Sequence, residues 1–208
     1  MVRMVARSKA AKMVYRADLT AGSLKVPESR IIADLLLRDA DEPEWHTSLF
    51  ERNVLQARSP ATTTRLARLI RGRLELMDRD LWLLVRDGTG TISTHAVLAA
   101  AVKHSVLLGD FLHLVVGEQC RTFGTALSAK HWEDFLDGCR GRDSEMPLWR
   151  ESTRRRLRST VFQILAQAGY VGNTRSLTLQ RVHIAAQVIQ YLKDHDERYV
   201  LRCIQVAA

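Results

Sequence analysis

The sequence predicts a mainly α-helical protein, with a helix-turn-helix-like N-terminal domain and a larger helical C-terminal domain. Its 208 residues include only four prolines and 11 glycines, so few positions interrupt a helix. Apolar residues recur at helical spacing in most long segments. Ser and Asp residues, which are favourable N-caps, precede several of these segments. These three observations favour helices over strands along most of the chain.

We predict three parts along the chain. Residues 1–16 form a basic arm, residues 17–79 the helix-turn-helix-like domain and residues 80–208 the helical domain, with a further boundary expected near residue 145. A chain of this length can hold one large or two small domains, each with its own apolar core. The arm has five basic residues and no acidic one. It lacks the continuous apolar run of a secretory signal, so we expect a cytoplasmic protein.

The N-terminal domain is expected to contain three helices. The first begins at Pro27, and the second covers residues 44–57. The third follows Ser59 and Pro60, because Ser is a good N-cap and Pro is tolerated at the first helical position. It extends to about Met77. Its predicted core stripe consists of Leu66, Leu69, Ile70, Leu74 and Met77.

The larger domain is expected to consist mostly of helices, with approximate ranges 81–85, 94–117, 128–138, 147–168 and 181–192. Asp80 is the expected cap of the first of them, and Gly109 and Gly117 are expected interruptions of the long apolar segment. Gly169 is a natural helix stop because glycine readily adopts a positive φ. A short strand at residues 176–179 would form a small winged-helix-like hairpin, and residues 199–206 are compatible with either helix or edge strand.

Basic residues are concentrated at the two ends of the chain. Residues 1–79 contain 15 basic and 10 acidic side chains, residues 80–147 contain six and nine, and residues 148–208 contain 10 and four. Segregated basic blocks favour a surface that contacts a polyanion. Nucleic acid is the partner that this pattern favours most, and an acidic protein surface is the alternative.

The strongest functional pattern lies in NVLQARSPATTTRLARLIRGRL, residues 53–74, where no acidic residue occurs. Short hydroxyls near the start of a helix can hold phosphate, and arginines further along can reach phosphates or guanine edges. The pattern therefore predicts a recognition helix; the alternative is an ordinary solvated basic face. The predicted DNA contacts are Arg58, Ser59, Thr62, Thr63, Arg65, Arg68 and Arg71.

A second basic cluster starts the predicted helix 147–168. Arg154, Arg155 and Arg158 are neighbours on a helix surface. Arg175 lies in the possible wing that follows. These four residues are further candidate DNA contacts, and a partner-binding or solvated face is the alternative.

Signals for catalysis, metals or cofactors are poor. The chain has no GxxxxGK[ST] and no GxSxG motif. His95, His104 and His113 recur every nine residues, and about 900° of rotation puts successive members on opposite faces of a helix. The three cysteines are widely spaced, which favours small buried thiols. We therefore expect a non-catalytic protein with no metal, no cofactor and no small-molecule substrate.

A membrane span is also disfavoured by the charged residues in the most apolar window. Residues 96–117 contain Lys103, His104, Asp110 and His113 near the middle of the window. A spanning helix rarely tolerates such residues. This window is instead expected to form one or two buried helices.

Three stretches together resemble the BrxA family of bacterial BREX phage-defence systems: residues 15–37, the tryptophan at Trp45 and residues 53–74. A weaker likeness returns at residues 164–171. The resemblance implies a bacterial, cytoplasmic, mostly helical protein with helix-turn-helix-like parts. It also implies a DNA-binding role beside other BREX proteins. The alternative is an adaptor whose basic faces dock acidic surfaces of larger BREX components.

Overall fold

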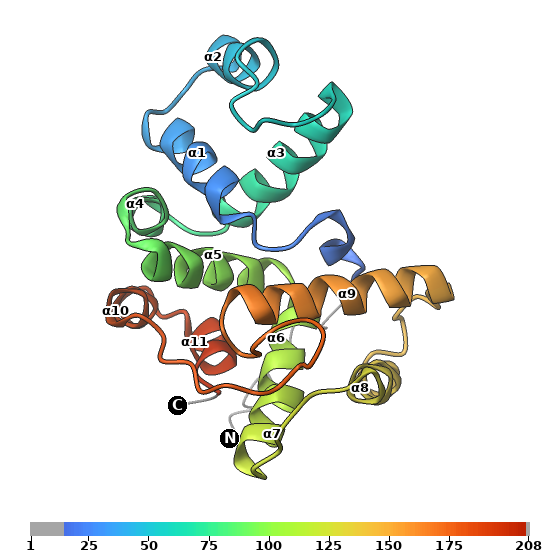
Figure 1. The fold of residues 1–208 in the computed structure, drawn as a ribbon. Helices are drawn as coiled ribbons and strands as arrows, with labels where there is room; N and C mark the ends of the chain where they lie inside the picture. Colours follow the sequence, from blue (N-terminus) through green and yellow to red (C-terminus); the bar gives the residue numbers. More distant parts are fainter. Residues whose placement is uncertain (1–14, 207–208) are drawn as a thin grey trace, which may run out of the picture.

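The computed structural model describes residues 15–206 and is mainly helical (Figure 1). The elements in chain order are η1 (Asp18–Ala21), α1 (Val26–Leu37), α2 (Glu42–His46), η2 (Thr47–Glu51), α3 (Pro60–Leu74), α4 (Arg79–Asp87), α5 (Gly90–His104), α6 (Val106–Asp110), η3 (Phe111–Val116), α7 (Gly117–Arg121), α8 (Ala129–Arg142), α9 (Glu151–Gln167), α10 (Ala186–Asp194) and α11 (Arg198–Ile204). Of these, η1 is a 3₁₀ helix, and η2 and η3 are π-helical. The predicted arm lies outside the described residues except for Tyr15 and Arg16.

The centre of the molecule is α5, which has α1, α3 and α4 on one side and α10 and α11 on another (Figure 1). All seven residues from Ala96 to Val102 are at most 1% exposed. A helix that is apolar on all sides is expected to be buried on all sides. Buried residues from both sides of residue 80 join one apolar cluster, so the predicted boundary there coincides with no break in the core.

The long apolar segment is interrupted at Ser105. Ser105 has an extended backbone, and its hydroxyl donates to Asp18 Oδ1 at 2.7 Å. The helices before and after it are bent by 111°. Near the interruptions predicted at Gly109 and Gly117 the chain stays helical but changes type, because the π-helical η3 begins at Phe111 and α7 begins at Gly117. Gly109 serves packing instead, because a Cβ there would lie 2.4 Å from the Tyr199 hydroxyl oxygen.

No single helix in the described part of the chain has the length and hydropathy of a membrane span. The helices on either side of Ser105 meet the criteria only as a bent pair, Gly90–His104 with Val106–Arg121.

Several helix ends lie where the sequence predicts them. The Ser59 hydroxyl accepts from the Thr62 amide at 3.3 Å, and Pro60 is the first residue of α3. Ser128 caps α8 and forms a capping box with His131. Gly169 follows α9 with φ 86°. The cap of α4 is Asp78 rather than Asp80.

Residues 170–180 form the hairpin-like loop that the sequence suggested, but it is held by isolated bridges. Val171 bridges Leu179, and Thr178 bridges Ala126. No extended strand occurs in residues 15–206. Residues 199–206, for which helix and strand were both open, contain the helix α11.

The predicted helix 181–192 begins only at Ala186. The three residues Val182, His183 and Ile184 alternate between buried and exposed, as extended chain does. The Ala185 amide donates to His95 Nδ1 at 3.0 Å, so an imidazole from α5 holds the extended segment in place. Burial lowers the pKa of His95, which favours the neutral ring that accepts this bond.

Candidate nucleic-acid interface

The N-terminal end of α3 is presented by the ordered connection of residues 52–59. Asn53 Nδ2 donates to the Ala57 carbonyl at 3.1 Å, and the Ala57 amide donates to Asn53 Oδ1 at 3.0 Å. The connection is longer than the roughly three- to four-residue turn of a helix-turn-helix. The predicted helix 44–57 therefore ends earlier, at Glu51 in η2, and the tight turn expected before α3 was wrong.

Three arginines here have unpaired guanidinium groups. Arg58, Arg65 and Arg68 are exposed, and none of them has an ion pair or side-chain hydrogen bond with another residue of the range 15–206. Arg65 and Arg68 are one turn apart on α3, at its sixth and ninth residues, and Arg58 lies just before the capped, positive N-terminal end of the helix. Unpaired cations beside an N-terminus are well placed to contact phosphate.

The predicted threonine contacts differ in accessibility. Thr62 is half-buried, and its hydroxyl lies 3.1 Å from the Ser59 hydroxyl. Thr63 is only 3% exposed, and its hydroxyl donates to the Ser59 carbonyl at 3.3 Å. The prediction that Thr63 contacts DNA was therefore wrong, because this side chain lies on the core face of α3.

Arg71 is only partly available. Its Nε donates to Glu75 Oε1 at 2.6 Å, and its guanidinium lies 4.7 Å from the ring centre of Trp45. Such stacking of a guanidinium on an indole face is attractive. Arg71 therefore contributes to the wall of a neighbouring cleft more than to the exposed face of α3.

This cleft, here called the α2–α3 cleft, lies between α3 and the α2–η2 segment and has a volume of about 380 Å³. Trp45 is buried, whereas Phe50 is 40% exposed. The His46 and Phe50 rings are 5.2 Å apart. The cleft is lined by Glu42, Trp45, His46, Leu49, Phe50, Thr64, Ala67, Arg68 and Arg71. Sequence reasoning missed this cleft, because it forms only when segments separated by a long connection pack together.

The second predicted cluster, on α9, is engaged in ion pairs with two carboxylates. Arg154 and Arg158 are both paired with Glu133 of α8, the latter at 3.4 Å. Their side chains are 22% and 28% exposed. Arg155 is exposed but pairs with Glu151 at 3.5 Å. That Arg154 and Arg158 contact DNA stays a prediction; both side chains are partly exposed and are held by Glu133 of α8.

Arg175 remains exposed in the hairpin-like loop and has no side-chain partner within the described range. It lies on a different segment from α3, and η1 packs against both α3 and α9.

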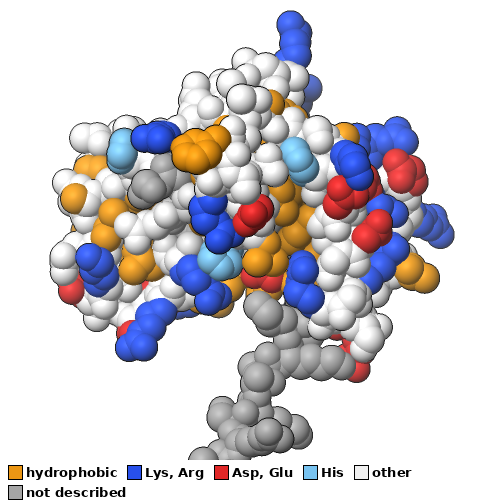
Figure 2. Space-filling view, turned by 90° about the horizontal axis from the view of Figure 1, so that it is seen from below, with side chains coloured by type: hydrophobic (Ala, Val, Ile, Leu, Met, Phe, Trp, Pro, Cys, Tyr) orange, Lys and Arg blue, Asp and Glu red, His pale blue; other side chains and the backbone are white. Residues whose placement is uncertain are grey.

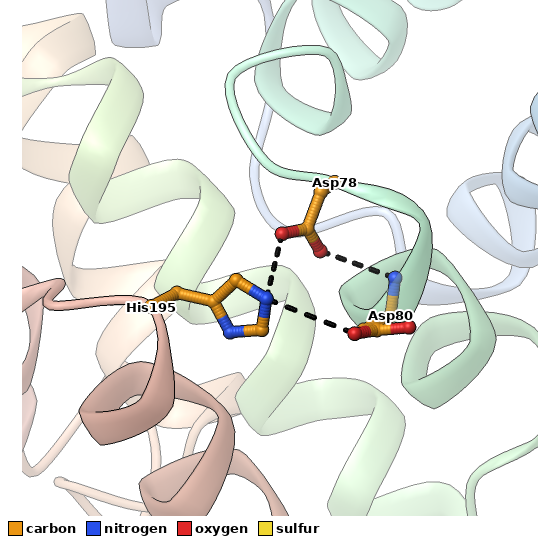
Figure 3. Close-up of side chains that lie close together, drawn as sticks. All are labelled: Asp78, Asp80 and His195. Carbon is orange, nitrogen blue, oxygen red and sulfur yellow. Dashed lines mark hydrogen bonds and ion pairs between the residues drawn. The ribbon is translucent and has the colours of Figure 1, made fainter.

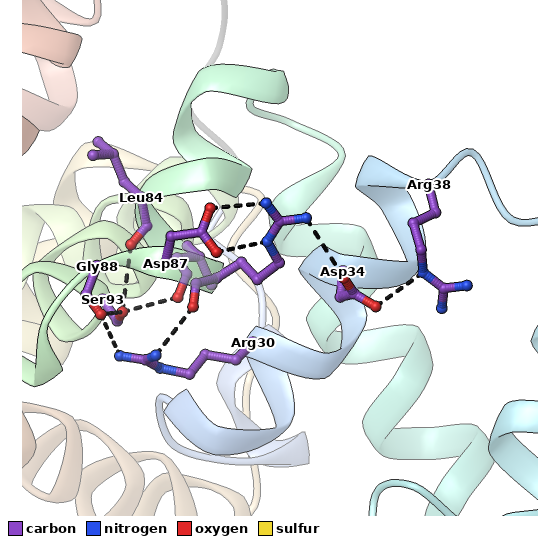
Figure 4. A network of polar contacts seen from close by, with 9 residues as sticks. Arg30, Asp34, Arg38, Leu84, Asp87, Gly88 and Ser93 are labelled. Atoms are coloured by element: carbon purple, nitrogen blue, oxygen red, sulfur yellow. Dashed lines mark hydrogen bonds and ion pairs between the residues drawn. The ribbon is translucent and has the colours of Figure 1, made fainter.

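Other basic residues of the N-terminal half are engaged in internal contacts (Figure 4). Arg30 of α1 donates to the Arg86 and Gly88 carbonyls at the end of α4. Arg86 pairs with Asp87 at 2.7 Å and with Asp34 at 3.5 Å. Acidic and basic side chains are also interspersed on the right-hand part of the face in Figure 2, which is seen from below. Arg58, Arg65 and Arg68 differ from these engaged arginines, and within residues 15–206 they share their lack of a side-chain partner with other exposed residues such as Arg156 and Arg181.

One group of three possible metal ligands occurs within residues 15–206: Asp78, Asp80 and His195 (Figure 3). His195 Nε2 lies 2.9 Å from Asp78 Oδ2 and 3.7 Å from Asp80 Oδ2, and its Nδ1 lies 2.9 Å from the Tyr191 carbonyl. Sequence reasoning missed this group, because His195 and Asp80 are 115 positions apart. The group lies at the surface, with 31% of the His195 side chain and 69% of the Asp80 side chain exposed.

The remaining histidine and cysteine predictions concern buried side chains. Burial lowers the pKa of His104, which lies near Asp18 and Arg73. Cys139 and Cys203 are buried and free, and burial raises the pKa of each thiol to about 11. Such thiols are poor nucleophiles at neutral pH, as expected of thiols that only fill space.

The BrxA family model matches residues 13–196, which is most of the chain. The chain belongs to the BrxA family. Among family relatives, a BREX protein BrxA from Paramagnetospirillum magneticum (strain ATCC 700264 / AMB-1) is 48% identical and covers 93% of this chain and 97% of its own. A BREX protein BrxA from Escherichia coli O9:H4 (strain HS) is 34% identical, over 86% of this chain and 85% of its own.

The BrxA-family fold has also been seen experimentally. A crystal structure of an uncharacterized protein from Magnetospirillum magneticum matches with a TM-score of 0.86 and 46% identity. The match covers 93% of this chain and 100% of that one. The family resemblance of residues 15–37 and 53–74 is thus confirmed, and the matches extend over nearly the whole of this chain.

Proposed function

We propose that this chain is a component of a bacterial BREX phage-defence system and binds double-stranded DNA through the start of α3. Its relatives carry the name BREX protein BrxA, which supports the first part. The observation that carries the second part is the unpaired, exposed set Arg58, Arg65 and Arg68, which stands beside a capped helix N-terminus. Phosphate contacts of this kind give affinity with little sequence preference. The role is one of binding, without chemistry of its own.

The first prediction concerns the salt dependence of duplex binding. If about five phosphates are neutralised, log K should fall with log salt at a slope of about −4 to −5. The double variant Arg65→Ala, Arg68→Ala should weaken binding to every duplex sequence alike and make the slope shallower by about two units. Fluorescence anisotropy at several salt concentrations measures both quantities.

The matched control removes the same amount of charge elsewhere. Arg121 and Arg198 have 71% and 87% exposed side chains, and each pairs with a nearby acid. The double variant Arg121→Ala, Arg198→Ala should leave the slope near that of the unmodified protein. Equal losses in the two double variants would show that net charge, not the α3 surface, determines binding. No duplex binding at low salt would overturn the proposal.

A second candidate function is a protein adaptor within the same system. It is favoured by two large apolar side chains that lie almost fully in solvent, Phe123 at 85% and Leu148 at 82% exposure. Contiguous exposed apolar patches mark protein-binding surfaces, so the adaptor requires these two side chains to belong to such a patch. Co-purification of other BREX proteins that is lost in Phe123→Ser, Leu148→Ser, together with no DNA affinity, would support the adaptor.

A further inference from the structure

The α2–α3 cleft combines aromatic and cationic side chains. Its aromatic side chains take no part in the proposed contacts of α3 with duplex DNA. Phe50 lies at its rim with 40% of its surface in solvent, beside the ring of His46. The lining also includes Arg71, whose guanidinium lies 4.7 Å from the ring centre of Trp45 and donates to Glu75. Two planar groups thus border a space of about 380 Å³, which is near the lower end of the range for small-molecule pockets.

The cleft adjoins the proposed DNA-binding surface through Arg68. This side chain lines the cleft, and it is one turn from Arg65 on the exposed face of α3. A phosphate bound by Arg65 and Arg68 would therefore lie at the mouth of the cleft. The one carboxylate in the lining, that of Glu42, repels phosphate but can accept hydrogen bonds from the exocyclic amines of bases.

We propose that the α2–α3 cleft receives the base of an unpaired nucleotide, so that the protein prefers DNA with a single-stranded segment over fully paired DNA. This inference rests on the proposed function and extends it. Aromatic rings and arginine planes on which bases stack, beside cations that hold the backbone, are the common elements of single-strand recognition. Phe50 is the stacking platform, Arg71 contributes its guanidinium plane to the lining, and Arg68 holds the adjoining phosphate.

The requirement for an unpaired base follows from the energetics of duplex DNA. A paired base is stacked inside the helix and can enter a protein cleft only after it is extruded, which costs a few kcal/mol. A base in a gap or a single-stranded tail is already unpaired, so most of this free-energy cost does not arise. Charge complementarity also favours a nucleotide over an apolar peptide segment, since two arginines line the cleft and Arg65 lies beside it.

The test compares three DNA molecules by fluorescence anisotropy: a blunt duplex, the same duplex with a single-stranded tail, and that duplex with a tail of abasic sites. The abasic tail keeps the phosphates and lacks the bases. We expect the base-bearing tail to tighten binding by about 5- to 100-fold. The abasic tail should tighten binding, relative to the blunt duplex, only by the contribution of its added phosphates. Equal affinity for the two tails would overturn the inference.

Variants of cleft residues test whether the preference for the base-bearing tail depends on the cleft. Phe50→Ala should abolish the preference for the base-bearing tail and leave blunt-duplex affinity unchanged, and Phe50→Trp should keep the preference. Phe123→Ala is the matched control, since Phe123 is 85% exposed and lies outside the cleft; it should keep the preference. Circular dichroism checks that each variant is folded.

The outcomes separate this inference from the proposed function. Duplex binding without a tail preference, or a preference that survives in Phe50→Ala, overturns the cleft while the proposed function stands. Equal loss of affinity for all three DNA molecules in folded Phe50→Ala also overturns it, because Phe50 would then serve general binding. If none of the DNA molecules binds, the proposed function fails first.

Discussion

Arg73→Met is expected to lower the free energy of unfolding by about 2–4 kcal/mol. Arg73 is only 2% exposed, and its guanidinium donates to the Ser23 carbonyl at 2.7 Å and the Gly22 carbonyl at 3.2 Å. These carbonyls belong to the connection between η1 and α1. Methionine fills most of the space but donates no hydrogen bond, so the partly buried carbonyls would lose their partners. Urea unfolding followed by circular dichroism measures the loss.

The control for this prediction is the same substitution two residues earlier on the same helix. The Arg71 side chain is 43% exposed, and Arg71→Met should cost less than about 1 kcal/mol. If the two variants lose the same stability, the burial of Arg73 does not determine its contribution.

Burial also explains the ionisation of Arg73. Desolvation lowers its pKa to about 10, and the nearby charge of Asp18 opposes part of that effect. A group with this pKa remains charged at neutral pH. The N-terminal segment thus contacts a buried cation, and no acidic side chain forms a direct ion pair with that cation within residues 15–206.

The second large effect is expected at Asp110, which is 7% exposed. Tyr15 donates its hydroxyl to Asp110 Oδ2 at 2.6 Å, and Tyr199 donates to Oδ1 at 3.0 Å. Asp110→Ala leaves both phenols without this acceptor and should lower the free energy of unfolding by about 3 kcal/mol. Thermal and urea unfolding, read by circular dichroism, provide the measurement.

Asp110→Asn is the matched variant, because the amide keeps one oxygen that can accept a hydrogen bond. We expect it to lose clearly less stability than Asp110→Ala. The result would contradict this account if alanine were tolerated as well as asparagine. The bond between Tyr15 and Asp110 spans 95 positions of sequence, so its loss should loosen the segment before α1 from α6.

The parts of the fold that follow from local chemistry could be predicted from the sequence. Ser59, Ser128 and Gly169 mark helix ends because their effects depend on residues within one turn. The extended segment 181–185 could not be predicted, since it is held by a hydrogen bond from the Ala185 amide to His95 on another helix. The bend at Ser105 was missed for the same reason, because its partner is Asp18.

In the candidate site too, features set by local sequence could be predicted and features set by tertiary contacts could not. The unpaired arginines Arg65 and Arg68 were predicted because a recognition pattern can be seen within one helix. The pairing of Arg154 and Arg158 with Glu133 was not predicted, since α8 and α9 meet only through tertiary packing. The sequence alone does not show which acid pairs with a cation when the two are 21 residues apart, as Glu133 and Arg154 are.

Glu133 has an evolutionary consequence. One carboxylate pairs with two arginines of α9, so a single codon change at position 133 to a neutral residue would leave both cations without this partner beside the exposed Arg155. The charge on this side of the molecule therefore depends on one codon.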